Sequence, residues 1–188
     1  MNLIIFGPPG AGKGTQADFI VNKFNLHQLS TGEVLRNEIK NKTKLGKEIS
    51  TIINSGTLVS DEIVKKLVEN FISDNKYKGR LIFDGYPRNL IQAKTLNELL
   101  SKYNQKIDLV LKLSVSLETI KKRISERRSL ENRADDSEVI AIKRYNTYEK
   151  TTEPLIDYYE KLNLLKVIDG ERSIDQINKE ISDIIGLI

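Results

Sequence analysis

The sequence predicts an α/β fold, a five-stranded parallel β-sheet with helices on both faces. Short apolar runs of three to five residues, bounded by turn or polar residues, alternate with stretches whose apolar residues follow helical spacing. This alternation is typical of βαβ units, which cover a parallel sheet on both sides. The chain has 188 residues, of which 39% are hydrophobic, so one core domain is expected over 1–188.

Five apolar runs are expected to form the strands. The first four have the composition of buried strands, and the last is a weaker candidate: 3–6, 81–83, 109–113, 164–168 and 26–29.

Helices are expected between these runs, where apolar residues recur three and four positions apart. The segments with this pattern are 17–24, 63–72, 90–100 and 174–185. The last one opens with a capping box, because Ser173 precedes Gln176 by three positions. Residues 30–59 are expected to form a small helical insertion, and the charge-rich stretch 114–162 is expected to be mostly helical.

Composition excludes several classes of protein. The chain has no Cys, which rules out disulfides and Cys-based zinc sites. Its net charge of +4 with 6% aromatic residues and no Trp argues against a nucleic-acid platform. The first residues, MNLIIFG, lack the features of a signal peptide, and no stretch is long enough to span a membrane. A cytoplasmic protein without nucleic-acid or membrane partners is expected.

Residues 7–15, GPPGAGKGT, follow the first expected strand and precede a helix. They nearly match the phosphate-binding loop G-x-x-x-x-G-K-[ST], in which backbone N–H groups surround an anion and the lysine reaches the β- and γ-phosphates. Gly14 stands where the motif has a hydroxyl that contacts Mg²⁺. Mg²⁺ is therefore expected to be held mainly by phosphate oxygens and water, with Thr15 as a further candidate ligand. The alternative is a Gly/Pro-rich turn that only joins a strand to a helix, but few chance matches to the motif have a strand before them and a helix after them.

A second motif, DGYPR at 84–88, ends another expected strand. A carboxylate at the C-terminal tip of a strand lies beside the binding crevice of an open α/β sheet, and in phosphate-loop proteins it holds Mg²⁺ directly or through water. Gly85 and Pro87 favour a turn that can place Arg88 over an anion. The alternative is a solvated turn, and the presence of the phosphate loop favours the functional interpretation.

These motifs resemble those of the adenylate kinase family. The glycine between Lys13 and Thr15 is similar to that family's phosphate loop, and 84–88 is similar to its DG[FY]PR motif, with Gln92 at the family's offset. STGEVLR at 30–36 resembles the STGDxxR segment, and TEPLIDYY at 152–159 resembles TxPLIxYY. The spaced arginines match the family's series: Arg123, Arg127, Arg133 followed by ADD, and Arg144. The resemblance runs from Met1 to the last helix.

The resemblance implies reversible transfer of the terminal phosphoryl group from Mg·ATP to AMP, giving two ADP, in adenine nucleotide homeostasis. A monomer is expected. The implied ATP contacts are Gly10, Ala11, Gly12, Lys13, Gly14, Thr15, Arg123, Arg127 and Arg172. The implied AMP contacts are Thr31, Arg36, Thr57, Leu58, Val59, Gly85, Tyr86, Pro87, Arg88, Gln92, Arg133 and Arg144. The implied catalytic set is Lys13, Asp84, Arg88, Arg123, Arg127, Arg133 and Arg144, with Asp84 acting on Mg²⁺ through water.

The chemistry of this transfer explains why so many arginines are needed. It brings two anions together, so positioning and charge neutralisation dominate. Seven of the nine arginines are assigned to the site, which leaves Arg80 and Arg128. His27, the only histidine, is expected to have a structural role.

Two features depart from the family pattern. Glu33 replaces its Asp, and only five residues separate Arg127 from Arg133. The second feature is typical of the short form, with a brief lid over 123–136 and no zinc site. Residues 30–59 and 123–136 are the expected moving parts.

Other functions stay open at this point. A kinase for CMP or UMP has similar motifs, although Thr31 and Gln92 favour adenine by resemblance. A GTP-binding switch needs an N-K-x-D motif, which is missing. A nucleic-acid-binding protein predicts strongly salt-dependent binding, which the small net charge makes a poor fit.

Overall fold

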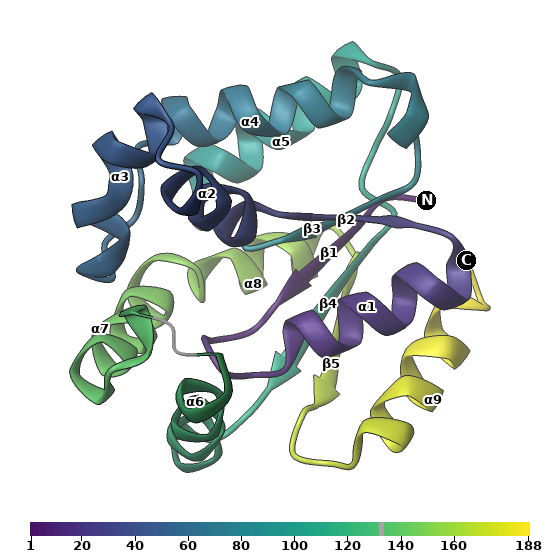
Figure 1. The fold of residues 1–188 in the computed structure, drawn as a ribbon. Coiled ribbons are helices and arrows are strands. Elements are labelled where there is room, and N and C mark those ends of the chain that lie inside the picture. The colour runs from purple at the N-terminus through teal and green to yellow at the C-terminus, as the bar shows by residue number, and fades with distance from the viewer. Residues whose placement is uncertain (132–133) are drawn as a thin grey trace.

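The computed structural model describes residues 1–131 and 134–188, and within them five strands form one parallel sheet (Figure 1). The sheet order is β2-β3-β1-β4-β5. The strands are β1 (Leu3–Phe6), β2 (His27–Ser30), β3 (Leu81–Asp84), β4 (Leu109–Ser114) and β5 (Leu165–Asp169). The α-helices are α1 (Lys13–Phe24), α2 (Thr31–Lys40), α3 (Lys44–Asn54), α4 (Asp61–Ser73), α5 (Leu90–Lys102), α6 (Leu117–Glu131), α7 (Glu138–Thr151), α8 (Pro154–Lys161) and α9 (Ile174–Ile185).

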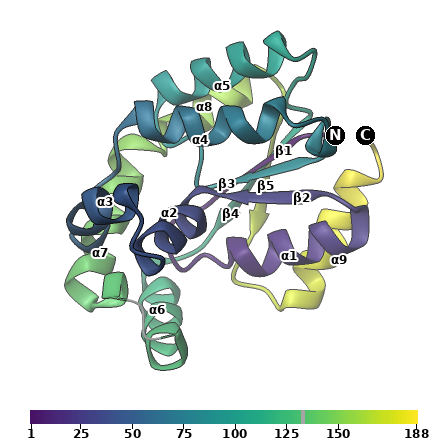
Figure 2. The ribbon, with the colours of Figure 1, turned by 45° about the horizontal axis from the view of Figure 1, so that its top comes forward.

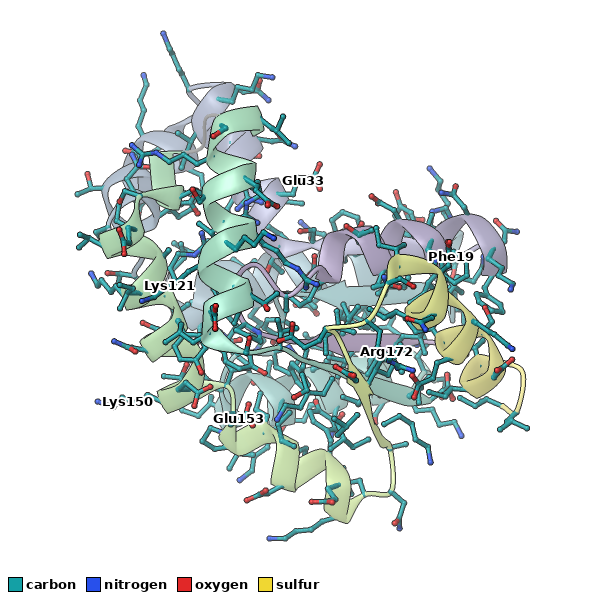
Figure 3. The ribbon with its side chains drawn as sticks, turned by 90° about the horizontal axis from the view of Figure 1, so that it is seen from below. Phe19, Glu33, Lys121, Lys150, Glu153 and Arg172 are labelled. Atoms are coloured by element: carbon teal, nitrogen blue, oxygen red, sulfur yellow. The ribbon has the colours of Figure 1, made fainter. Side chains whose placement is uncertain are left out.

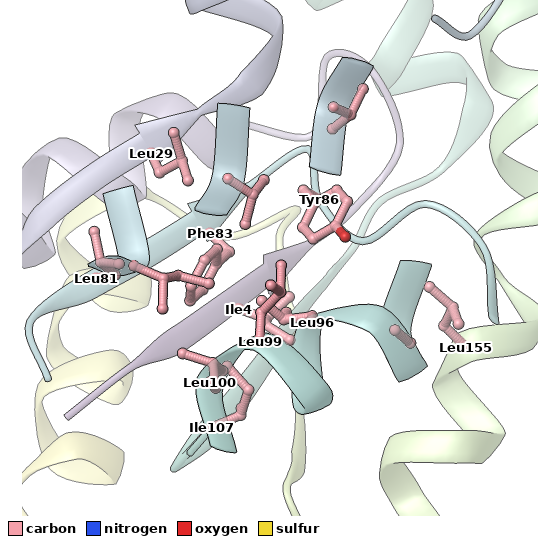
Figure 4. Packing of buried hydrophobic residues seen from close by; sticks show 14 of the residues in the cluster. Ile4, Leu29, Leu81, Phe83, Tyr86, Leu96, Leu99, Leu100, Ile107 and Leu155 are labelled. Atoms are coloured by element: carbon pink, nitrogen blue, oxygen red, sulfur yellow. The ribbon is translucent and has the colours of Figure 1, made fainter. Parts of the chain in front are cut away.

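Two apolar layers hold the helices to the sheet. Strand side chains alternate between the two faces. Ile4 and Phe6 pack on one face with α4, α5 and α8, whereas Leu3 and Ile5 pack on the other with α1 and α9. Figure 4 shows part of the first layer, where Ile4 and Phe83 meet residues of α5. Each such side chain that folding buries contributes roughly 1.5–3 kcal/mol.

The topology brings the candidate site to one edge of the sheet. The chain leaves β1 toward β2 on one side, and it leaves β4 toward β5 on the other. Ligands of open α/β sheets bind at the carboxyl ends of the strands near such a reversal. Helices α2, α3, α6 and α7 gather at this end, while both chain termini lie at the opposite end (Figures 1 and 2).

The α/β fold and the five-stranded sheet predicted from the sequence are confirmed, including the weakest strand, β2. Residues 30–59 contain helices α2 and α3, and 114–162 contains α6, α7 and α8. The capping box of Ser173 and Gln176 forms at the start of α9. The prediction of a buried strand at 164–168 is wrong in one respect: β5 is an edge strand, and Val167 is 56% exposed.

In the part of the chain that the structure describes, every helix is too short or too polar to cross a lipid bilayer.

Candidate functional site

The loop between β1 and α1 has the backbone of an anion-binding nest. Gly12, the N-cap of α1, is left-handed at φ 93°, and it has no side chain to cap the first N–H groups of the helix. Gly10 has φ 85°, and a Cβ there would lie 2.9 Å from Ile124 Cγ1 and 3.2 Å from the Ile120 carbonyl oxygen. Only glycine fits this close approach to α6. The uncapped N–H groups at the positive end of the α1 dipole are suited to a phosphate.

The Lys13 ammonium lies over this loop, donating to the carbonyl oxygens of Gly7 at 2.8 Å and Pro8 at 3.0 Å. The pKa of Lys13 is lowered to about 8, chiefly by burial; Asp84 opposes the decrease, and the nearby charges of Arg88, Arg144 and Arg127 contribute to it. The site therefore concentrates positive charge that a polyphosphate can neutralise.

A cleft opens between the insertion, the end of β3 and α7, with about 600 Å³ of empty space including its open mouth. We call it the insertion cleft. Its lining residues are Thr31, Gly32, Leu35, Arg36, Ile53, Gly56, Thr57, Leu58, Val59, Val64, Gly85, Arg88, Gln92, Asp135 and Arg144. The lining combines an apolar wall with cations, as in small-molecule sites.

The turn after β3 positions Arg88 at the cleft. Gly85 accepts hydrogen bonds on its carbonyl oxygen from Arg88 Nε at 2.7 Å and from Thr31 Oγ1 at 3.0 Å. The Arg88 carbonyl oxygen in turn accepts from Thr152 Oγ1 at 3.0 Å. The pKa of Arg88 is lowered to about 10, chiefly by burial and in part by the neighbouring charge of Arg144. This side chain remains a cation at neutral pH.

A second cavity connects the insertion cleft to the phosphate loop. It shares Gly85, Arg88 and Arg144 with the cleft, and it adds Lys13 and Pro9. One nucleotide in the cleft and another on the loop would therefore direct their phosphates toward the same arginines.

Two buried carboxylates hold the arginines that face this junction. Asp136 accepts from Arg127 Nε at 2.7 Å and from Arg127 Nη2 at 2.5 Å. Arg144 contacts Asp135 Oδ2 at 2.9 Å and Asp136 Oδ1 at 3.3 Å. Both aspartates are buried, so these ion pairs fix the two guanidinium groups. Arg133, which the sequence assigned to the same group, lies outside the described residues.

On the other side of the phosphate loop, Arg123 joins three segments. Its guanidinium donates to the Ala11 carbonyl oxygen at 3.3 Å and to the Gly170 carbonyl oxygen at 2.9 Å. The next residue, Glu171, accepts from the Ser116 N–H at 2.6 Å and from Thr119 Oγ1 at 2.7 Å. Its carboxylate therefore caps the start of α6. These hydrogen bonds hold the pKa of Glu171 at about 2. The loop after β5 is thus attached to the helix that carries Arg123 and Arg127.

Arg172 lies in the loop that leads into α9 (Figure 3), and it lines neither of the two cavities. It forms ion pairs with Glu180 of α9 and with Asp169. A role at the site would have to come from its backbone.

The residues near the loop also suit a magnesium–nucleotide complex. Asp84 ends β3, and its Oδ2 accepts from Gln28 Nε2 at 3.0 Å. A Cβ added at Gly14 would have no neighbouring atom within 4 Å, so the space beside this residue is open. Among residues 1–131 and 134–188, no three His, Cys, Asp or Glu side chains group as a metal site. One carboxylate beside an anion nest fits an ion held largely by phosphates and water.

The structure brings together most of the residues assigned from the sequence. Nine of the proposed AMP contacts line the insertion cleft, and Pro87 lines the second cavity. Tyr86 instead packs its ring into the core, at 1% exposed. Thr57, Leu58 and Val59 approach the cleft from the end of the insertion.

The structure also shows where the residues left out of the predicted site lie. Arg80 binds Asn25 at the opposite end of the sheet, His27 packs edge-on against Tyr77, and Arg128 is exposed on α6. Sequence reasoning missed the apolar wall of Leu35, Ile53 and Val64, although the helical spacing around them was a usable signal.

Comparison with known proteins places these features in a family. The model of the family described as Adenylate kinase matches residues 5–164. The chain is 44% identical over 211 positions to an adenylate kinase of Pelagibacter ubique, covering 98% of this chain and 99% of that protein. It is 45% identical over 181 positions to an adenylate kinase of Prochlorococcus marinus, covering 96% of each. It is 40% identical to one of Fusobacterium nucleatum, covering 99% of each.

The alignment lengths differ in an informative way. The 211 positions aligned with the Pelagibacter protein exceed the 188 residues of this chain, so at least 23 positions have no counterpart here. The 181 positions aligned with the Prochlorococcus protein need no such gap. The chain therefore lacks internal positions that some relatives have, and it is similar in length to others.

Proposed function

The chain belongs to the adenylate kinase family, and we propose that it catalyses reversible transfer of the terminal phosphoryl group of Mg·ATP to AMP, giving two ADP. The observation that carries this proposal is the junction of the two cavities. Arg88 and Arg144 line both, with Lys13 of the phosphate loop on one side and Arg36 of the insertion on the other.

We assign the phosphate loop to ATP and the insertion cleft to AMP. The α1 N–H groups and Lys13 would bind the ATP phosphates. Arg123 and the loop at Gly170 would lie against the ATP adenine. In the cleft, Arg36 and Arg88 would bind the AMP phosphate, and Gln92 would contact the adenine. This arrangement aligns the two substrates with their phosphates facing, as in-line transfer requires.

Charge neutralisation is the main contribution expected from the protein. Arg127 and Arg144 are held by Asp135 and Asp136, so their guanidinium groups are fixed before the nucleotides arrive. Fixed cations stabilise charge on the transferring group without reorganising during the reaction. Lys13 would exchange its hydrogen bonds to Gly7 and Pro8 for bonds to the phosphates.

Magnesium bound with the nucleotide would neutralise part of the phosphate charge. Asp84 would orient water on that ion, and Thr15 is the alternative ligand from α1. The position of both residues beside the nest supports these assignments.

We further propose that residues 30–59 and 123–136 close over the substrates. Closure would exclude water, which competes with AMP as phosphoryl acceptor. The lid of adenylate kinase is a standard example of such motion. We propose a monomer as the active species.

An acceptor panel tests the proposal. AMP, CMP, UMP, dTMP and GMP are offered separately with Mg·ATP, and ADP formation is followed. AMP is expected to give the highest kcat/KM. A higher value for any other acceptor would assign the chain a different nucleotide.

A further inference from the structure

We propose that Asp61 sets the base specificity of the acceptor site by fixing the orientation of the Gln92 amide. The inference rests on the proposed function in one respect, namely that Gln92 faces the acceptor base. Asp61 itself lies behind Gln92. Within the described chain, the residues lining the insertion cleft include Gln92 but not Asp61. Asp61 would therefore be a positioning residue.

Gln92 is held at both ends of its side-chain amide. Its Oε1 accepts a hydrogen bond from the Arg88 backbone N–H at 2.7 Å. Its Nε2 donates to Asp61 Oδ1 at 2.6 Å. The side chain is 4% exposed, so little water competes for either hydrogen bond.

These two partners permit one orientation of the amide. A carboxylate only accepts hydrogen bonds and a backbone N–H only donates. Turning the amide over would direct its oxygen at the Asp61 carboxylate and its NH₂ group at the Arg88 N–H. Both hydrogen bonds would be lost in a buried place, where unsatisfied polar groups are costly.

Asp61 is fixed in its turn by the neighbouring helix. It is the first residue of α4, and Asn89 Nδ2, at the N-cap of α5, donates to its two oxygens at 3.2 and 3.4 Å. Asn89 Oδ1 also accepts from the Gln92 backbone N–H at 2.8 Å. Asp61, Asn89 and Gln92 therefore form a closed network across the start of α4 and α5.

A fixed amide presents its remaining donor and acceptor in a fixed order. The second Nε2 hydrogen and the second lone pair of Oε1 stay available to a ligand. A 6-aminopurine offers a donor at N6 and an acceptor at N1. A 6-oxopurine offers an acceptor at O6 and a donor at N1, which is the reverse order. An amide free to turn over could serve both bases, whereas the amide held by Asp61 serves one.

IMP is the most direct probe, because it differs from AMP only at N1 and at the 6-position substituent. The kcat/KM values for AMP and IMP are measured on the same preparation with Mg·ATP. Their ratio does not depend on the fraction of folded enzyme. We compare the native chain with Asp61→Ala, Asp61→Asn and Glu62→Ala.

Asp61→Ala should lower the AMP-to-IMP ratio by about tenfold, because one of the two restraints on the amide is lost. Asp61→Asn retains an acceptor oxygen for Gln92 and should keep the ratio within about threefold of the native value. Glu62→Ala removes an equal charge from the same helix turn at an exposed position, and it should leave the ratio unchanged.

Two results would overturn the inference. If Asp61→Ala lowers both kcat/KM values equally, Asp61 has only a structural role. If Asp61→Asn loses as much discrimination as Asp61→Ala, the acceptor atom is not what matters. Failure of the native chain to phosphorylate AMP would instead refute the proposed function, and the role of Asp61 with it.

Discussion

Nucleotide binding at the phosphate loop should take up protons from alkaline solution. The pKa of Lys13 is lowered to about 8 by burial and by neighbouring cations. Bound phosphates reverse the effect of those cations and favour the charged ammonium. In the free protein, the Lys13 side chain is deprotonated in a fraction of about 0.1 of the molecules at pH 7, about 0.5 at pH 8 and about 0.9 at pH 9. Mg·ATP binding should therefore take up at most these numbers of protons per protein molecule.

Titration calorimetry measures this uptake directly. Mg·ATP is titrated without an acceptor in buffers of different ionisation enthalpy, and the slope of the observed enthalpy against that quantity gives the proton number. Lys13→Arg is the matched control, because Arg keeps the charge and does not titrate in this range. A slope near zero at pH 9, or an equal slope in Lys13→Arg, would refute the assignment of the low pKa to Lys13.

The same pKa gives the sign of a stability effect. Between about pH 8 and the ordinary value of 10.5, the unfolded chain binds the Lys13 proton and the folded chain does not. The contribution of Lys13 to the free energy of unfolding therefore increases as pH rises through this range. Nucleotide affinity changes in the opposite direction, since binding requires the proton.

Three substitutions test other parts of the structure. Gly46→Ala should lower the free energy of unfolding by about 2–3 kcal/mol in urea titrations, because its Cβ would lie 2.0 Å from the Glu38 carbonyl oxygen; a loss under about 0.5 kcal/mol would contradict this packing. Arg88→Ala should reduce kcat/KM for AMP at least about a hundredfold with little change in ATP affinity. The control Arg128→Ala, at an exposed position, should keep activity near the native value. An equal loss of activity in both variants would mean that the lid register is shifted. Glu171→Ala should raise KM for ATP roughly threefold or more and leave KM for AMP unchanged, since it frees the loop beside Arg123 from α6; equal increases in both would show a general loss of structure.

Much of the site was predictable because its motifs lie where strands end. The phosphate loop follows β1 and the DGYPR motif ends β3, and these strands are neighbours in the sheet. Parallel topology alone then brings Lys13 and Arg88 to the same edge. The prediction of β5 as a buried strand failed because apolar composition does not show whether a strand has one neighbour or two.

Side-chain pairings between distant elements could not be predicted from the sequence. Glu171 caps a helix that begins 54 positions earlier, at Leu117, and Asp61 reaches Gln92 from another helix. Each pairing depends on how two elements pack, which local spacing does not specify. The ADD segment beside Arg133 was noticed as part of a family motif, but its role as counter-ion to Arg127 and Arg144 follows only from the contacts.

The structure of the chain bound to AMP tests the central claim most directly, because the insertion cleft is assigned to the acceptor. We expect the AMP phosphate within about 3 Å of the guanidinium groups of Arg36 and Arg88, with the adenine against Gln92. AMP bound only at the phosphate loop, with the insertion cleft empty at saturating AMP, would contradict the account.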